Sequence, residues 1–397
     1  MAVFGVWMWP QSVRDYGADR VAALCASIGV TDIYFLTKGL AGTVSYRSAL
    51  APQCCDRDLI AELLDAAHAR GIRVHAWLTS ASDEHYKHLF PESGRCHYTR
   101  GKDKGLISLS DDGYLSYMER ILRELCSHYD IDGLHLDYIR YNHLLYGWSE
   151  EDMARYAGAG ADIAHLRRLM EKTFISKQNA ECIFDAYREG DSSVLALAQA
   201  RRSDVRRFAG ALTACARTER KNLMLSAALM PEGAYEDTAF ADLHYGQIYA
   251  DAAALYDAVL PMAYSKAYEK DSAWVRAVAE STVKQRLNTI MGLHAYEGGT
   301  GPSLLSDLHA LRHTAIGGIC LFRFGAFALA IPDGNSIRVI NTLDQAITAV
   351  ESSCGASRLT DSKTILPGEE TVLSLPFPAS SLRVFCGGTE TCVYFAK

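Results

Sequence analysis

Ionisable and apolar side chains alternate along the stretch DIDGLHLDYIRY, which runs from Asp130 to Tyr141. In an extended strand, successive side chains point to opposite faces, so the two leucines share one face while His135 and Asp137 share the other. A carboxylate on such a strand is costly to bury unless a polar site receives it. Asp137 is therefore either a catalytic acid or a structural carboxylate that caps the next helix or pairs with Arg140.

Further side chains that could bind a substrate stand near the ends of other strand-like segments. Aromatic rings can stack on a sugar ring, and polar groups can bind its hydroxyls. Aromatic and histidine side chains inside a protein are often only core residues, so the joint arrangement carries more weight than any member. The predicted substrate-binding residues are Trp7, Lys38, His75, Trp77, His135, Arg140, Tyr141, Tyr264, His294 and Arg323.

Cleavage of a glycosidic bond requires a second carboxyl group, acting with the first as acid, base or nucleophile. Ser226, Ala228, Met230 and Glu232 share one face of their strand, and the small members of this set suit a crowded barrel interior. Glu232 is therefore expected to point to the barrel mouth if the chain stays extended through Pro231. Glu297 falls on the opposite parity of its own strand, but it stands beside two glycines, where the alternation can be lost. Glu232 is the preferred partner of Asp137, and Glu297 is the alternative.

Eight strand-like segments separated by helical ones must position these residues. Eight strand–helix units predict a (β/α)8 TIM barrel, in which the active site lies at the carboxyl ends of the strands. No GxGxxG motif follows the first strand, which removes the usual signal of a dinucleotide-binding fold. The expected strands are Ala2–Pro10, Asp32–Thr37, Ile72–Thr79, Asp130–Tyr141, Leu223–Met230, Ala258–Tyr264, Asn288–Ala295 and Gly318–Phe324.

The expected domain organisation is a barrel over residues 1–352 and a small all-β appendage over residues 353–397. A helical insertion follows the fourth strand, over residues 142–191, and helix Ser192–Thr218 resumes the barrel pattern. Residues Ser336–Val350 are predicted to form the helix that closes the barrel. The segment Ser80–Ser110 is expected to be a long loop.

The overall composition argues against several classes of partner. The net charge of -7 gives no sign of a nucleic-acid or anionic-membrane partner. The 11 cysteines show no metal-binding spacing, and reduced thiols are expected, so no cofactor or metal is predicted. No apolar run approaches a membrane span and no signal peptide is seen, so a cytoplasmic location is expected, with a secreted protein trimmed of its leader as the alternative. The oligomeric state stays open.

Several stretches resemble the bacterial family 10-like glycosyl hydrolases, a group of barrel proteins. The fourth-strand motif is the most specific of them, and the resemblance covers roughly residues 1 to 350. The stretches, in chain order, are Gly42–Ser48, Ala67–Leu78, Asp112–Tyr141, Ala200–Leu212 and Asp257–Tyr264.

This resemblance implies a glycosidase that acts on a carbohydrate substrate. In more distant barrel glycosidases with a similar fourth-strand motif, the matching Asp is the nucleophile and a fifth-strand Glu is the acid/base, which implies these roles for Asp137 and Glu232 and a retaining mechanism. The chain also departs from the family, because relatives often have two adjacent acids where Asp137 is followed by Tyr138. A barrel that binds carbohydrate without cleaving it is therefore an alternative. A metal-dependent amidohydrolase is a weaker one, because the first strand lacks an HxH motif.

Overall fold

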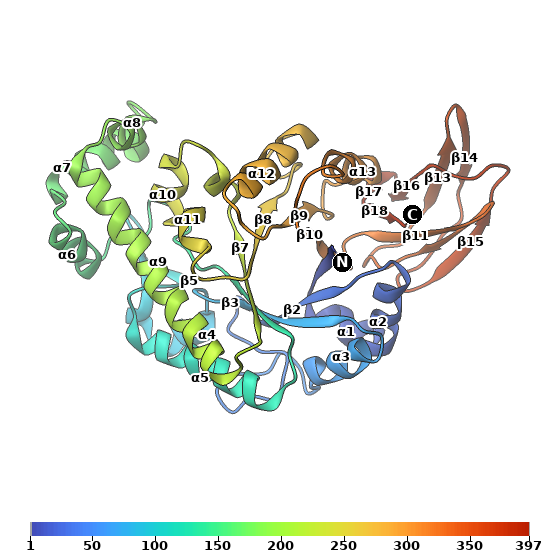
Figure 1. The fold of residues 1–397 in the computed structure, drawn as a ribbon, viewed down its shortest axis with the longest axis horizontal. Helices are drawn as coiled ribbons and strands as arrows, with labels where there is room; N and C mark the ends of the chain where they lie inside the picture. The colour runs from blue at the N-terminus through green and yellow to red at the C-terminus, as the bar shows by residue number, and fades with distance from the viewer. Residues whose placement is uncertain (1, 397) are drawn as a thin grey trace. The chain divides into compact units, whose positions relative to one another are not determined.

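The computed structural model describes residues 2–396 and contains a closed barrel of eight parallel strands. Figure 1 shows the course of the chain through its helices and strands. The strands follow the order β1-β10-β9-β8-β7-β6-β3-β2 around the barrel. All eight strands predicted from the sequence are present, and the (β/α)8 fold class is confirmed. Their bounds are β1 Val3–Met8, β2 Asp32–Lys38, β3 Arg73–Thr79, β6 Gly133–Asp137, β7 Met224–Leu229, β8 Ala258–Ala263, β9 Ile290–His294 and β10 Gly318–Phe324.

Aspartate residues cap the N-termini of several helices between these strands. Each carboxylate accepts a hydrogen bond from a backbone N–H in the first helical turn, where the helix itself supplies no acceptor. Three such pairs are Asp58 with α3 (Leu59–His68), Asp111 with α5 (Asp112–His128) and Asp191 with α9 (Ser192–Glu219). Further helices are α1 (Pro10–Tyr16), α2 (Ala18–Ser27), α12 (Ser272–Lys284) and α13 (Gly301–Ala310). Within residues 2–396 no helix has the length and apolar character needed to cross a membrane.

The chain divides into two compact units. Unit 1 comprises Met1–Leu36, Arg57–Ala76 and Leu260–Lys397, and unit 2 comprises Thr37–Asp56 and Trp77–Val259.

Unit 2 contains the helical insertion expected after the fourth strand. Its elements are α6 (Glu150–Gly158), α7 (Ile163–Met170), a π-helical turn (Glu171–Ile175) and α8 (Cys182–Arg188). They share an apolar core with the first turns of α9, and its largest buried members are aromatic or long aliphatic side chains: Leu144, Trp148, Tyr156, Leu166, Met170 and Phe184. The segment expected to be a loop before α5 also contains α4 (Glu84–Leu89) and a hairpin of β4 (Gly94–His97) and β5 (Gly101–Ile107).

The predicted closing helix over Ser336–Val350 is wrong. Residues Ser336–Ile340 form strand β12, which pairs with β11 (Ala328–Asp333) and β15 (Glu370–Ser374). The physical reason is a period of two, because Ile337 and Val339 are buried while Ser336 and Arg338 are less buried. The β-sheets therefore begin at Ala328, ahead of the boundary predicted between residues 352 and 353.

Two four-stranded sheets make up this C-terminal part of unit 1. Their orders are β15-β12-β11-β18 and β14-β13-β16-β17, where the further strands are β13 (Ala349–Cys354), β14 (Ser357–Asp361), β16 (Ser381–Cys386), β17 (Thr389–Thr391) and β18 (Val393–Phe395). Apolar side chains from both sheets form one buried cluster, among them Ile337, Val339, Val350, Leu382 and Val384.

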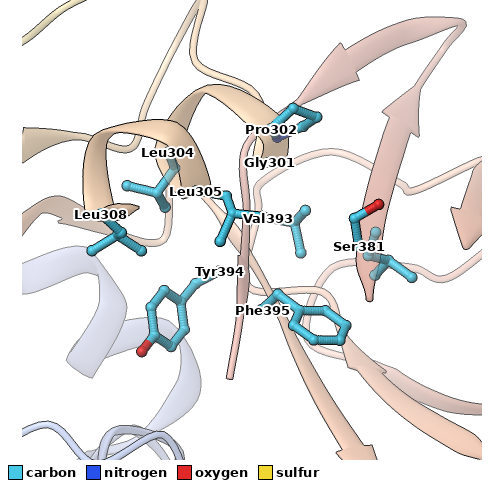
Figure 2. Close-up of a pocket in the computed structure, with 10 residues that line it drawn as sticks. Gly301, Pro302, Leu304, Leu305, Leu308, Ser381, Val393, Tyr394 and Phe395 are labelled. Carbon is cyan, nitrogen blue, oxygen red and sulfur yellow. The ribbon is translucent and has the colours of Figure 1, made fainter. Parts of the chain in front are cut away.

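Helix α13 packs closely against strand β18 in the same unit. Figure 2 shows leucines of the helix beside the strand, at a small hollow of about 20 Å³ whose labelled lining includes Leu304, Leu305, Leu308, Val393, Tyr394 and Phe395. The first helical residue is Gly301, where an added Cβ would lie 2.7 Å from the Leu382 carbonyl oxygen and from Val393 Cγ1. Only glycine lets the helix begin this close to the strand.

Candidate active site

Asp137 is the last residue of β6, and its carboxylate is held by donors from three directions. Trp77 Nε1 donates to Oδ2 at 3.2 Å. The backbone N–H of Tyr138 donates to Oδ1 at 2.7 Å, and Arg140 Nη1 donates to the same oxygen at 3.2 Å. Since the side chain of Asp137 is 7% exposed, these contacts fix the carboxylate in one orientation at the carboxyl end of the strand.

The backbone turns sharply immediately after this carboxylate. Tyr138 has a φ of 57°, in the left-handed region that side chains other than glycine rarely adopt. The turn lets the Tyr138 N–H reach back to Asp137, and it places the Arg140 guanidinium 4.7 Å from the centre of the Tyr138 ring. Strain of this kind, stored next to a carboxylate, is typical of functional sites.

Glu232 lies in the short 3-10 helix Pro231–Ala234 that follows β7, and it is 8% exposed. Its Oε1 accepts a hydrogen bond from the hydroxyl of Tyr245 at 3.4 Å. Burial raises the pKa of Tyr245, and the negative charge of Glu232 raises it further, whereas the positive charge of Arg140 lowers it. Tyr245 is therefore within electrostatic reach both of Glu232 and of the arginine that binds Asp137.

Buried contacts of Tyr141 and Arg95 hold the segment that carries Arg140. Tyr141 lies between two guanidinium groups, with Arg201 at 3.7 Å and Arg95 at 5.0 Å from the ring centre. The Tyr141 hydroxyl donates to Asp204 Oδ2 at 2.7 Å, and Arg95 Nη1 donates to the carbonyl oxygen of Arg140 at 2.9 Å. Tyr141, predicted to bind substrate, is 1% exposed and so acts here as a support for its neighbour.

Lys38, at the end of β2, forms a buried ion pair in place of an open binding group. Its Nζ lies 3.0 Å from Asp83 Oδ2, and both side chains are fully buried. The same nitrogen donates to the carbonyl oxygen of Ser82 at 3.0 Å and to the Tyr114 hydroxyl at 3.3 Å. Burial lowers the pKa of Lys38, while the charge of Asp83 opposes that shift. These contacts secure the chain after β3.

Two of the three predicted histidines, His75 and His135, lie in the barrel core. His75 Nε2 is 2.7 Å from Asp32 Oδ1, and both side chains are fully buried. His135 Nδ1 is 2.9 Å from the hydroxyl of Ser226, its partner in the parallel pairing of β6 and β7. Both histidines are therefore core residues with polar partners, which is the alternative to substrate binding given for aromatic and histidine side chains in the sequence analysis.

In unit 1 an aromatic group surrounds Trp7, which is 1% exposed. Tyr34, Tyr264 and Phe322 have ring centres 5.8 to 6.5 Å from that of Trp7. Gly292 on β9 allows this packing, because an added Cβ would lie 2.9 Å from the Trp7 ring. Trp7 is thus the buried centre of a packed aromatic group, in which Tyr264 and Phe322 are half-buried.

The remaining predicted residues of unit 1 lie at or beyond the ends of β9 and β10. His294 Nε2 donates to the carbonyl oxygen of Glu297 at 2.9 Å, and its ring stacks on Tyr296 at 4.0 Å. Glu297 itself is exposed. Arg323 lies 3.5 Å above the centre of the Trp9 ring, and burial lowers its pKa.

The structure thus brings three predicted residues, Trp77, Asp137 and Arg140, into direct contact. Two residues of the candidate active site were not predicted from the sequence. They are Tyr138, whose ring supports Arg140, and Tyr245, which binds Glu232. The left-handed turn at Tyr138 leaves no mark in the residue pattern. Tyr245 ends helix α10 (Ala239–Tyr245), and its only signal is the following Gly246, typical of a helix end. Across residues 2–396, no three His, Cys, Asp or Glu side chains are grouped to hold a metal ion.

Comparisons with known proteins support the fold at low sequence identity. The PgaB (BpsB) glycoside hydrolase domain from Bordetella bronchiseptica is 15% identical, with a TM-score of 0.65 over 81% of this chain and 94% of that chain. The catalytic domain of a β-amylase from Paenibacillus polymyxa is 10% identical, with a TM-score of 0.57 over 81% and 92% of the two chains.

A β-galactosidase from Marinomonas ef1 is 12% identical, with a TM-score of 0.57, and this chain spans about half of its length, 54%. No model of a known protein family matches the chain, and no curated protein matches it. These likenesses show the barrel fold, and the resemblance to family 10-like glycosyl hydrolases stays a prediction.

Proposed function

We propose that this protein is a glycoside hydrolase that acts on an oligo- or polysaccharide. The observation that carries the proposal is the Asp137 carboxylate, which ends β6 and is held by Trp77, Tyr138 and Arg140. The carboxyl ends of the strands are where barrel enzymes place their reacting groups. The glycoside hydrolases among the structural neighbours have the same fold, which raises the weight of this reading.

In the proposed mechanism Asp137 is the nucleophile and Glu232 is the acid/base. Glu232 donates a proton to the glycosidic oxygen as its bond to the anomeric carbon breaks, and an oxygen of Asp137 forms a bond to that carbon. Water then attacks the glycosyl-enzyme while Glu232 takes up a proton, which releases the sugar and restores both carboxyl groups. Trp77 and Arg140 hold Asp137 in line for attack.

The residues around Glu232 suit an acid/base group. Glu232 is nearly buried, and the neutral hydroxyl of Tyr245 donates a hydrogen bond to its Oε1, which helps to orient the carboxyl group. Glu297 is exposed on a loop of unit 1 and is the rival for this role. Retention requires about 5–5.5 Å between the two carboxyl groups, and inversion about 6.5–9.5 Å.

The test is a screen of glycans and aryl glycosides with the wild-type protein and the Asp137→Asn variant. We expect turnover of at least one substrate, with kcat/KM reduced on the order of a thousandfold in Asp137→Asn, because a reacting group is lost. Glu232→Gln and Glu297→Gln, compared in the same assay, identify the second carboxyl group. NMR of the first-formed sugar anomer shows retention or inversion. Turnover that survives Asp137→Asn would remove Asp137 from the chemistry.

A second candidate function is carbohydrate binding without cleavage. The specific observation in its favour is that Arg140 pairs with Asp137 and that the Asp137 side chain is 7% exposed, as in a structural ion pair. Saccharide binding to the wild-type protein, with no turnover across the whole screen, would support this function over the hydrolase.

A further inference from the structure

A cavity of about 600 Å³ lies within unit 1, where the ends of barrel strands face the C-terminal sheets. This volume is in the range of ligand-binding pockets, about 300–1,000 Å³. On the barrel side the lining residues come from β10 or follow β1 and β9: Trp9, Tyr296, Glu297, Phe322 and Arg323. On the other side they come from the segment after β12 and from the β16–β17 hairpin: Leu343, Asp344, Gln345, Thr389, Glu390 and Thr391.

The barrel side of the cavity is aromatic. Tyr296 and Phe322 lie edge to face, with ring centres 5.3 Å apart. The Trp9 ring is half-buried, and the Arg323 guanidinium lies 3.5 Å from its centre. Flat aromatic surfaces beside a cationic group offer a sugar ring both an apolar face and a hydrogen-bond donor.

The hairpin side is polar, and one of its groups lacks a partner. Glu390 Oε2 accepts from Arg383 Nε at 3.0 Å, while Glu390 Oε1 is buried and has no hydrogen-bond partner. An unsatisfied carboxylate oxygen is costly and invites a donor from a ligand. Thr389 and Thr391, the neighbours of Glu390 on strand β17, also line the cavity.

We propose that the β16–β17 hairpin and the barrel strand ends of unit 1 together form a saccharide subsite, whose volume of about 600 Å³ accommodates several sugar units. Aromatic residues on one wall, and carboxylate, amide and hydroxyl groups on the other, are the complement of a sugar ring with its hydroxyls. The assignment of a saccharide rests on the proposed function, and it gives the C-terminal sheets a role in selecting the substrate.

The test compares Glu390→Gln with a matched control, Glu351→Gln. Both glutamates pair with Arg383, and Glu351 Oε2 lies 3.0 Å from Arg383 Nη1, but only Glu390 lines the cavity. Binding is measured by calorimetry in the full chain with Asp137→Asn, using cello-, malto- and galacto-oligosaccharides graded from disaccharide to hexasaccharide. We expect affinity for the longer chains to fall about tenfold with Glu390→Gln, as when a hydrogen bond to a charged group is lost. Glu351→Gln should leave it within about twofold.

A second variant, Asp344→Asn, changes an exposed residue of the same cavity and does not threaten folding. It should weaken binding of the longer chains in the same direction. Equal losses with Glu390→Gln and Glu351→Gln, or affinity that does not depend on chain length, would overturn the subsite.

Failure of the subsite can be told apart from failure of the proposed hydrolase. If binding depends on Glu390 but the wild-type protein cleaves no glycan, the subsite stands and the hydrolase fails. If the wild-type protein cleaves glycans, and binding by the Asp137→Asn chain does not respond to Glu390→Gln, the hydrolase stands and the subsite is wrong.

Discussion

Two carboxylates of the barrel, Asp32 and Asp137, are bound by alternate residues of the same strand, β3. Asp32 is fully buried, accepts a hydrogen bond from Arg73 at 2.9 Å and lies 2.7 Å from His75. Asp137 accepts from Trp77, the next residue with the same parity. Strand β3 therefore supplies a donor to a carboxylate in each compact unit.

The position of each carboxylate along its strand separates their roles. Asp32 is the first residue of β2, and Asp137 is the last residue of β6. In barrels of this class the amino ends of the strands serve stability and the carboxyl ends serve catalysis. Asp32 is fully buried among its hydrogen-bond donors, whereas Asp137 is followed by the strained backbone turn at Tyr138. We therefore expect loss of the Asp32 contacts to unfold the protein, and loss of the Asp137 contacts to impair its chemistry.

The largest expected effect is on stability, from His75→Phe. This change leaves the buried Asp32 carboxylate without its imidazole partner, and breaking a buried pair costs about 3–5 kcal/mol. Chemical denaturation of the variant should show a free energy of unfolding lower by that amount. Turnover per folded molecule should stay within about twofold. A stable His75→Phe protein with lost activity would reverse the roles of the two carboxylates.

Trp77→Phe, two residues further along β3, tests the other half of the comparison. It keeps an aromatic ring but removes the N–H that orients Asp137, and a hydrogen bond to a charged group is worth about 1.5–3 kcal/mol. We expect kcat/KM on the substrate found in the screen to fall about tenfold or more. The free energy of unfolding should fall less than with His75→Phe. A larger loss of stability than of activity would make Trp77 a structural residue.

The residue pattern predicts the face of a strand on which a side chain lies, but it does not predict which residue of a neighbouring strand that side chain meets. Alternation places His75 and Trp77 on one face of β3, and this prediction is confirmed by their inward contacts with Asp32 and Asp137. The alternation does not predict which carboxylate each donor binds, because the partner depends on the register between neighbouring strands. His75 was for this reason expected to bind substrate, although it lies in the core.

Segments without a clear period were harder to predict. The fold class and all eight strands were predictable, because short apolar runs bounded by turn residues leave few other structures. Tyr245 was not, since it reaches Glu232 from the end of a short helix in the connection after β7. The sequence predicts a helix over Ser336–Val350 because the alternation of strand β12, Ser336–Ile340, is too short to distinguish a strand from the surrounding sequence.

Tyr245→Phe should give a smaller loss of activity. Its hydroxyl donates to Glu232 at 3.4 Å, a long hydrogen bond, so we expect kcat/KM to fall roughly three- to tenfold, near the lower limit for a charged acceptor. The matched control is Tyr249→Phe, because the Tyr249 hydroxyl binds the Met230 carbonyl oxygen at 3.0 Å and not a carboxylate. Equal losses in the two variants would remove Glu232 from the proposed chemistry.

The smallest effect concerns pH and again separates the two carboxylates. Burial alone would raise the pKa of Asp32, but hydrogen bonds from His75 and Arg73 outweigh it and lower the pKa in the folded protein. A lowered folded pKa means that the unfolded chain binds the proton first. The stability that Asp32 contributes is therefore present above the unfolded pKa, about 3.9, and is lost as the pH falls below it.

Asp32→Asn removes this dependence, because its side chain has no proton to gain. Free energies of unfolding of the wild-type protein and Asp32→Asn, measured by denaturant titration from neutral pH into the acid range, should converge below pH 4. The difference between the two proteins should be constant above that range. Parallel curves throughout would mean that Asp32 is not held as a carboxylate by His75 and Arg73. The contrast with Asp137 would then rest on position along the strand alone.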